Sequence, residues 1–350
     1  MGQDNRMNKK LSQTIISTAL ILSLSISFSG CAKDPGKKTL ATLTRAADGI
    51  YTMDCYIDYK IDDYLAANIT DVKQFDTWMT NNLTHGVPTG DIDDIGCSSF
   101  AVKNPEGDHL FGRNYDWDNG ESIVIRTNPA NGYTSIGIAD LNHVNLGSHG
   151  DYSMDDEKSR SLLFAAPWCI CDGINEKGLG VSLLELYDEH VVNDTSKGDL
   201  LIYSATRVLL DKCANVDEAI KFLESYDIYT PRSNTYHVFL TDKTGRSVVV
   251  EWDQEGSMRV IEDNDVTNFA LYKQDLTQDY DQRYAKIRRR IDSADTMSSS
   301  DAMEVLKAVY HDTRWSAVYD LEKFSVDICF NGDYEVCFSF NGIDDNNIRS

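Results

Sequence analysis

Hydrophobic residues recur every three to four positions along residues 63–83, where Leu65, Ile69, Val72 and Phe75 would share one face of a helix. The sequence predicts a helical stretch there and another over residues 39–56. Helical patterns return over 198–210, 216–226, 279–291 and 300–311. Helices are therefore expected before the first strands and between the later ones.

The alternation of small and apolar residues that is typical of a half-buried strand begins after residue 96. Residues 97–102 and 109–117 predict a hairpin around a turn at 104–108, and 236–241 with 247–252 predict another. Other predicted strands span 123–126, 133–138, 180–186, 259–262, 316–321, 325–330 and 334–340. Hairpins on both sides of a helical middle part indicate an α+β domain with antiparallel sheets.

The first thirty residues form an export signal rather than part of the fold. Basic residues precede an apolar stretch over 11–28, and Ser29-Gly30-Cys31 follows. This end resembles the lipobox of bacterial lipoproteins, in which the Cys is acylated, although Phe28 replaces the usual Leu. We expect a lipid on Cys31 and a location on the extracytoplasmic face of the cell membrane. The alternative is an uncleaved membrane anchor, for which the apolar run is short.

Composition limits the class of protein. The chain has 350 residues, 41% of them hydrophobic, which is enough for a real core in one large domain or two small ones. Its formal net charge of -23 argues against a nucleic-acid partner, because binding a phosphate backbone requires a cationic surface. Two acidic clusters, 91–94 and 344–347, lack the ligand order of a calcium loop and are expected to be solvated.

The eight cysteines show neither paired CxxC motifs nor zinc-type His pairing, so neither a metal nor a cofactor is expected. Cys169 and Cys171 alternate in an apolar run and are predicted to be buried strand residues. Cys329 and Cys337 lie on opposite arms of a predicted hairpin around residues 331–333. Export would permit disulfides, but the sequence leaves the pairing open.

Cys97 is the cysteine that a catalytic role would suit. A catalytic thiol needs a base, and the aromatic-rich signature of papain-like enzymes is absent around it. Another possible base is the nucleophile's own α-amino group, with an ordinary pKa of about 7.7–8.0. That solution requires cleavage of the Gly96–Cys97 bond. Gly96 suits the cleavage, because glycine tolerates strain and hinders the attacking thiol little.

Two motifs carry a family resemblance, Gly96-Cys97-Ser98-Ser99-Phe100 and Gly112-Arg113-Asn114-Tyr115-Asp116-Trp117. They resemble the N-terminal-nucleophile (Ntn) hydrolases of linear amides, which include choloylglycine hydrolase, penicillin V acylase, the acyltransferase of penicillin synthesis and acid ceramidase. Later segments follow the family's order, namely 173–180, 237–242 with 248–251, 266–268 and 283–284. The first two motifs together are the specific signal.

The resemblance implies an α+β fold of four layers, an αββα sandwich of antiparallel sheets. It also implies three segments. Residues 1–30 would be the lipoprotein signal peptide, and 31–96 a helical pro-segment or small subunit that carries the lipid. Residues 97–350 would be the catalytic domain. The two fragments should remain associated after cleavage, so that the anchor holds the catalytic chain at the membrane.

The resemblance also implies roles for individual residues. Cys97 would be nucleophile and, through its amine, base; Asp116 would hold the amine and Arg113 would lie beside the thiol. Asn268 would donate to the oxyanion, Arg283 would complete the network, and Glu185 would belong to the site. Two assignments have rivals in the sequence. Asn264 competes with Asn268, and Arg283 competes with a cluster expected to be solvated, Arg288, Arg289 and Arg290.

The substrate is inferred from Glu185, at a position where the bile-salt branch has Asn. A Glu there resembles the acid ceramidase branch, as does the long segment before Cys97, so we expect an N-acyl amide with a lipid-like acyl chain. A bile-salt or penicillin V type acylase and an acyltransferase are alternatives. Two alternative hypotheses belong to other functional classes. They are a surface lipoprotein that binds ligands without catalysis and a papain-like thiol protease.

Overall fold

The computed structural model describes residues 34–90, 96–117, 120–189, 191–230, 234–274 and 281–342, all of them within one unit, Ala32–Ser350. The predicted signal peptide, Cys31 and both acidic clusters lie outside the described residues. Among the residues that are described, no helix is long and apolar enough to cross a membrane.

One sheet has nine strands, in the order β1-β2-β5-β6-β7-β8-β11-β12-β13. Neighbouring strands are antiparallel except β2 and β5, which run parallel. The strands are β1 (Thr44–Ala47), β2 (Ile50–Cys55), β5 (Ser122–Thr127), β6 (Ser135–Asp140), β7 (Ile170–Asn175), β8 (Leu179–Glu189), β11 (Asn234–Asp242), β12 (Ser247–Trp252) and β13 (Met258–Glu262).

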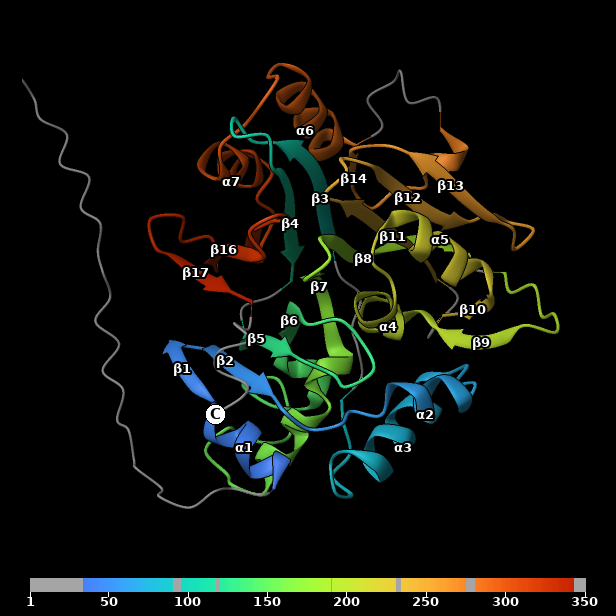
Figure 1. The fold of residues 1–350 in the computed structure, drawn as a ribbon, viewed down its shortest axis with the longest axis vertical. Coiled ribbons are helices and arrows are strands. Elements are labelled where there is room, and N and C mark those ends of the chain that lie inside the picture. Colours follow the sequence, from blue (N-terminus) through green and yellow to red (C-terminus); the bar gives the residue numbers. More distant parts are fainter. Residues whose placement is uncertain are drawn as a thin grey trace, which may run out of the picture. The chain divides into compact units, whose positions relative to one another are not determined.

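The second large sheet has six antiparallel strands, in the order β14-β3-β4-β15-β16-β17. They are β14 (Asp265–Val266), β3 (Gly96–Lys103), β4 (His109–Asp116), β15 (Thr313–Asp320), β16 (Ser325–Phe330) and β17 (Cys337–Asn341). A small parallel pair joins β9 (Gly198–Leu201) to β10 (Tyr226–Tyr229). The chain is thus a mixed α+β protein with two main sheets (Figure 1).

Buried apolar side chains join the two sheets and the helices. Phe111 and Trp315 of the six-stranded sheet pack with Ile138 and Phe239 of the nine-stranded one. The other face of the nine-stranded sheet contacts α4 and α5, and the other face of the six-stranded sheet contacts α6 and α7. The helices are α1 (Pro35–Ala41), α2 (Ile61–Ala66), α3 (Val72–Asn82), α4 (Ala205–Lys212), α5 (Val216–Glu224), α6 (Gln282–Asp292) and α7 (Ser299–Ala308).

The N-terminal part differs from the sequence prediction. Residues 39–56 were expected to be a helix, but only α1 is helical, and the rest forms the β1–β2 hairpin. Gly49 makes its turn with φ of 69°, a conformation that glycine adopts readily. Segment 31–96 is therefore not purely helical. Its two strands belong to the nine-stranded sheet, where β2 finds a partner in β5.

Two other segments that were predicted to be helices are only partly helical in the structure. The helix over 63–83 is divided into α2 and α3, because Asn68 takes a left-handed φ of 48° and Asp71 caps the second helix through the Gln74 N–H. The segment 198–210 begins with a strand, β9, and becomes helical in α4. Pairing with β10 decides that strand, and such a partner is not visible in local periodicity.

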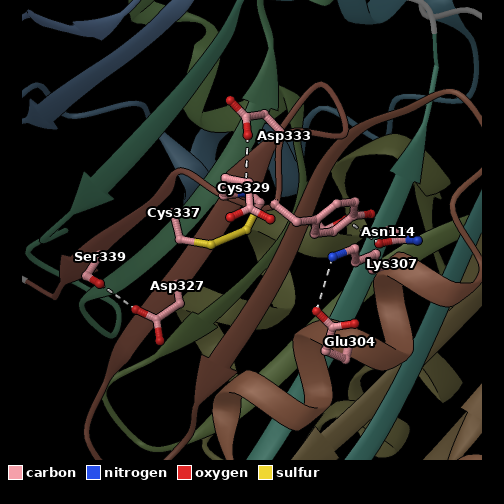
Figure 2. The surroundings of a disulfide bond; sticks show 11 residues. Asn114, Glu304, Lys307, Asp327, Cys329, Asp333, Cys337 and Ser339 are labelled. Atoms are coloured by element: carbon pink, nitrogen blue, oxygen red, sulfur yellow. Dashed lines mark hydrogen bonds and ion pairs between the residues drawn. A yellow bond between two sulfur atoms is a disulfide. The ribbon is translucent and has the colours of Figure 1, made fainter. Parts of the chain in front are cut away.

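The cysteine pairing that the sequence left open is decided in the six-stranded sheet. Cys329 on β16 and Cys337 on β17 are directly opposite each other and form a disulfide (Figure 2). Cys169 and Cys171 are free and buried, as the alternation predicted. Of these two, Cys171 lies in β7, whereas Cys169 ends the short 3₁₀ turn just before it.

Candidate active site

Cys97 is the second residue of β3 and lies opposite Tyr115 of β4. Its side chain is fully buried and belongs to the core between the two sheets. The predicted hairpin of β3 and β4 therefore carries the Cys-to-Arg-to-Asp motif on two neighbouring strands. Two separate polar networks meet at Cys97, one at its sulfur and the other at its backbone nitrogen.

The sulfur network begins at Arg113 of β4. Its Nη2 donates to Cys97 Sγ at 2.7 Å and to the carbonyl of Leu183 at 2.9 Å. Its Nε lies 3.4 Å from Asp172 Oδ2, and both side chains of this ion pair are fully buried. The guanidinium is thus wedged between the six-stranded sheet and strands β7 and β8.

Burial raises the pKa of the Cys97 thiol to about 12, and it outweighs the nearby Arg113 guanidinium, which acts to lower the pKa. The thiol is therefore protonated at neutral pH. A base is needed to take that proton before the sulfur can attack a carbonyl carbon.

Asp172 is a site residue that the sequence reasoning missed. Besides Arg113, its carboxylate accepts hydrogen bonds from Trp315 Nε1, at 3.1 Å, and from the Tyr319 hydroxyl. Burial raises its pKa, and the Arg113 guanidinium opposes that change. The available signal was a lone carboxylate inside the apolar run 170–174, because a buried charge requires partners.

The nitrogen network begins at Asn268. Its Oδ1 accepts from the backbone N–H of Cys97 at 2.7 Å and from Arg283 Nη2 at 2.9 Å. Its Nδ2 donates to the carbonyl of Glu185 at 2.7 Å. These contacts assign the orientation of the amide, because the oxygen faces two N–H donors and the nitrogen faces a carbonyl oxygen. The oxyanion role expected of Asn268 would use the donor atom of this amide, Nδ2.

Asp116 is the third member of the nitrogen network. Its Oδ2 accepts from Arg283 Nη1 at 2.7 Å, and its Oδ1 accepts from the Thr313 hydroxyl at 2.6 Å. Asp116 lies opposite Gly96 in the β3–β4 pair, so the carboxylate stands beside the bond that precedes Cys97. Burial raises its pKa, opposed by the Thr313 hydrogen bond and Arg283.

The rival residues lie elsewhere. Asn264 contacts β3 through its backbone carbonyl, which accepts from the Ala101 N–H at 2.8 Å. Arg288 is half-buried, and its guanidinium lies within ion-pair distance of Asp263 and Asp265. Its neighbours Arg289 and Arg290 are exposed. Among these arginines, it is Arg283 that contacts both Asn268 and Asp116.

Glu185 is fully buried on β8, opposite Tyr236 of β11. Its backbone carbonyl reaches the nitrogen network through Asn268. All six residues predicted for the site, Cys97 among them, are therefore buried or half-buried. Glu185 joins the network through its backbone carbonyl. Among the described residues, no group of three or more His, Cys, Asp or Glu could hold a metal ion.

This arrangement, a cysteine at a strand start with Arg, Asp and Asn around it, is that of an enzyme, a hydrolase acting on carbon–nitrogen bonds of linear amides. The chain belongs to the choloylglycine hydrolase family of linear amide C–N hydrolases, whose model matches residues 97–304. No curated protein matches the chain.

Solved structures show the same fold. A mutant of conjugated bile acid hydrolase from Clostridium perfringens superposes with a TM-score of 0.52 at 19% identity, covering 72% of this chain and 93% of that one. Another variant of the same enzyme gives a TM-score of 0.53 at 16% identity, covering 70% and 92%. At these identities the likeness extends to the fold. The fold class expected from the sequence, α+β, is confirmed.

Proposed function

We propose that this enzyme activates itself by cutting the Gly96–Cys97 bond and then hydrolyses N-acylated small molecules through a thioester on Cys97. One observation carries the proposal: a buried network contacts the sulfur of Cys97, and a separate, partly buried network contacts its nitrogen. Arg113 contacts Sγ, and Asn268 contacts the backbone nitrogen. A purely structural cysteine would not need a charged partner for its sulfur and a polar one for its nitrogen.

Self-cleavage begins when Cys97 Sγ attacks the carbonyl carbon of Gly96. The thiol gives up its proton as it attacks, and the bond from that carbon to Cys97 N breaks. The departing nitrogen takes up the proton that the thiol released, and a thioester links Gly96 to the sulfur. Water then hydrolyses the thioester, which leaves a carboxylate on Gly96 and a free amine on Cys97. Asn268 Oδ1 already contacts the departing nitrogen, so the amine is held from the moment it forms.

In the cut enzyme the free α-amine of Cys97 serves as the general base. It takes the thiol proton, the thiolate attacks the substrate's amide carbon, and the amine returns the proton to the leaving nitrogen. Water then releases the acid and restores the thiol. Asn268 donates to the oxyanion, a contribution of about 3–4 kcal/mol for one preorganised donor. Arg283 and Asp116 hold Asn268 and the amine in place.

The segment before Cys97 should remain bound after cleavage as a small subunit. Its strand β2 is paired with β5 over six residues, from Ile50 to Cys55. Tyr59 donates its hydroxyl to Asp211 at 2.8 Å and accepts from Trp168 Nε1 at its backbone carbonyl. The retained segment would join the catalytic chain to a lipid on Cys31 at the extracytoplasmic face of the membrane.

We also propose that the layers follow the four-layer αββα order of Ntn hydrolases. Three buried clusters support this order, because one lies between the sheets and the other two lie between each sheet and its helices. The substrate class proposed is an N-acyl amide with a lipid-like acyl chain. It rests on Glu185 and on the length of the segment before Cys97.

The test uses the full chain and a Cys97→Ala control. Denaturing gels and N-terminal sequencing should show a large fragment that begins at Cys97, and the control should remain uncut. A single uncut chain with full activity would refute self-processing. A panel of bile-salt conjugates, penicillin V, N-acyl amino acids and N-acylethanolamines then tests the substrate class. Release of acid supports hydrolysis, whereas a new amide in the presence of an added amine indicates acyl transfer.

A further inference from the structure

Asn268 lies in an irregular segment between β14 and the short 3₁₀ turn Leu271–Lys273. No sheet ladder fixes its backbone there, yet Asn268 Oδ1 lies 2.7 Å from the nitrogen of Cys97. A buried carboxylate, that of Glu251 on β12, holds the segment just beyond Asn268. Glu251 Oε1 accepts the N–H of Leu271 at 2.8 Å, and Oε2 accepts that of Tyr272 at 2.9 Å.

The imidazole of a histidine lies against this carboxylate. His237 Nδ1 on β11 lies 2.7 Å from Glu251 Oε1, and both side chains are fully buried. Burial acts to raise the pKa of Glu251, but His237 and the two backbone N–H groups outweigh it, and the pKa is lowered. Glu251 is therefore ionised at neutral pH, with both oxygens occupied. Side chains of two adjacent strands, β11 and β12, thus anchor the segment that follows Asn268.

We propose that Glu251, supported by His237, is a positioning residue for Asn268, an inference that rests on the proposed function. The carboxylate fixes the peptide units three and four residues after Asn268, and so limits where the Asn268 amide can lie. Reaction rates are sensitive to such placement, since a shift of about 1 Å can cost about a hundredfold. Glu251 acts through the backbone N–H groups of Leu271 and Tyr272.

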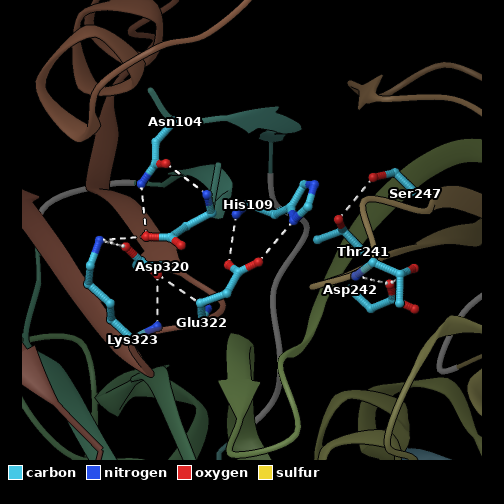
Figure 3. Close-up of polar contacts among 10 residues, drawn as sticks. Asn104, His109, Thr241, Asp242, Ser247, Asp320, Glu322 and Lys323 are labelled. Atoms are coloured by element: carbon cyan, nitrogen blue, oxygen red, sulfur yellow. Dashed lines mark hydrogen bonds and ion pairs between the residues drawn. The ribbon is translucent and has the colours of Figure 1, made fainter. Parts of the chain in front are cut away.

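The chain offers a matched control in Asp242, at the end of β11. Asp242 is also buried, and its carboxylate also accepts two backbone N–H groups, from Val216 at 2.9 Å and Thr244 at 2.8 Å. Figure 3 shows Asp242 beside Thr241 and Ser247, whose hydroxyls are hydrogen-bonded to each other where β11 ends and β12 begins. Asp242→Asn should therefore cost stability in the same way as Glu251→Gln, but it should leave the Asn268 segment in place.

The kinetic experiment compares the wild type, Glu251→Gln and Asp242→Asn, all as full chains. We expect Glu251→Gln to lower kcat and the rate of self-cleavage roughly ten- to a hundredfold, with KM within about twofold. Asp242→Asn should stay within about twofold of the wild type in all three quantities. In an Asn268→Ala background, Glu251→Gln should add little further loss. Equal effects of Glu251→Gln and Asp242→Asn, or full additivity with Asn268→Ala, would overturn the proposal.

A second readout does not depend on turnover. Amide hydrogen exchange, followed by mass spectrometry, should be faster in the peptide spanning residues 265–274 of Glu251→Gln and unchanged there in Asp242→Asn. Unchanged exchange in Glu251→Gln would overturn the proposal even if the wild type proved active. Conversely, an uncut and inactive wild type would refute the proposed function, while the exchange result would still decide whether Glu251 holds this segment.

Discussion

Substitutions at Arg113 can separate its proposed effect on catalysis from its effect on stability. Its guanidinium contacts both the Cys97 sulfur, at 2.7 Å, and the Asp172 carboxylate, at 3.4 Å from Nε. Arg113→Met removes both contacts while keeping an unbranched apolar stem. Arg113→Met with Asp172→Asn also removes the buried negative charge that would otherwise be left without its cation.

The magnitudes follow from the contacts. A hydrogen bond to a charged group contributes about 1.5–3 kcal/mol, so losing it at the thiolate should slow acylation roughly ten- to 150-fold. Breaking a buried ion pair by removing one partner costs about 3–5 kcal/mol of stability. Asp172 keeps Trp315 and Tyr319 as donors, so we expect about 3 kcal/mol for Arg113→Met. The double variant should recover most of that stability.

The assays are urea unfolding for stability, and time courses of self-cleavage and amide hydrolysis for activity. We expect the single and double variants to be equally slow, although the double variant is the more stable. A double variant that regained wild-type rates would refute the reasoning, because the rate loss would then come from instability rather than from the missing contact at Cys97. Tyr319→Phe, which removes a neutral donor to the same carboxylate, is the control for a small stability change alone.

Three other predictions concern stability and assembly. After cleavage between Gly96 and Cys97, the fragments should co-elute in size-exclusion chromatography and separate only in denaturant; early separation would contradict the β2–β5 pairing. The pKa of Asp265 is raised by burial from 3.8 to about 8, so its folded state favours the proton. The wild type should therefore lose stability relative to Asp265→Asn as pH rises between these values, measured by urea unfolding, whereas a constant difference would refute this. Reducing the Cys329–Cys337 disulfide should cost about 2–3 kcal/mol, since it closes a short loop; Cys329→Ser with Cys337→Ser should then be insensitive to dithiothreitol.

Much of the strand framework could be predicted from local patterns. The β3–β4 and β11–β12 hairpins are present where alternation and turn residues placed them. The proximity of Cys97, Arg113 and Asp116 was also predictable, because these residues lie on one hairpin at short sequence separation. Their proximity depends only on strand pairing, and strand pairing is what the alternation of apolar residues and the turn encode.

Contacts between distant segments were decided by the tertiary structure alone. The choice of Asn268 over Asn264 depends on how the chain leaves β14, and the pairing of Arg113 with Asp172 depends on how the two sheets face each other. Segment 39–56 became a hairpin because β5 offered an open edge to β2. By itself, the sequence predicted Cys97 as the nucleophile, Arg113 and Asp116 as its neighbours, and the α+β class. Packing between the sheets decided the rest, because a buried charge or strand edge can be satisfied only by whichever segment the fold brings to it.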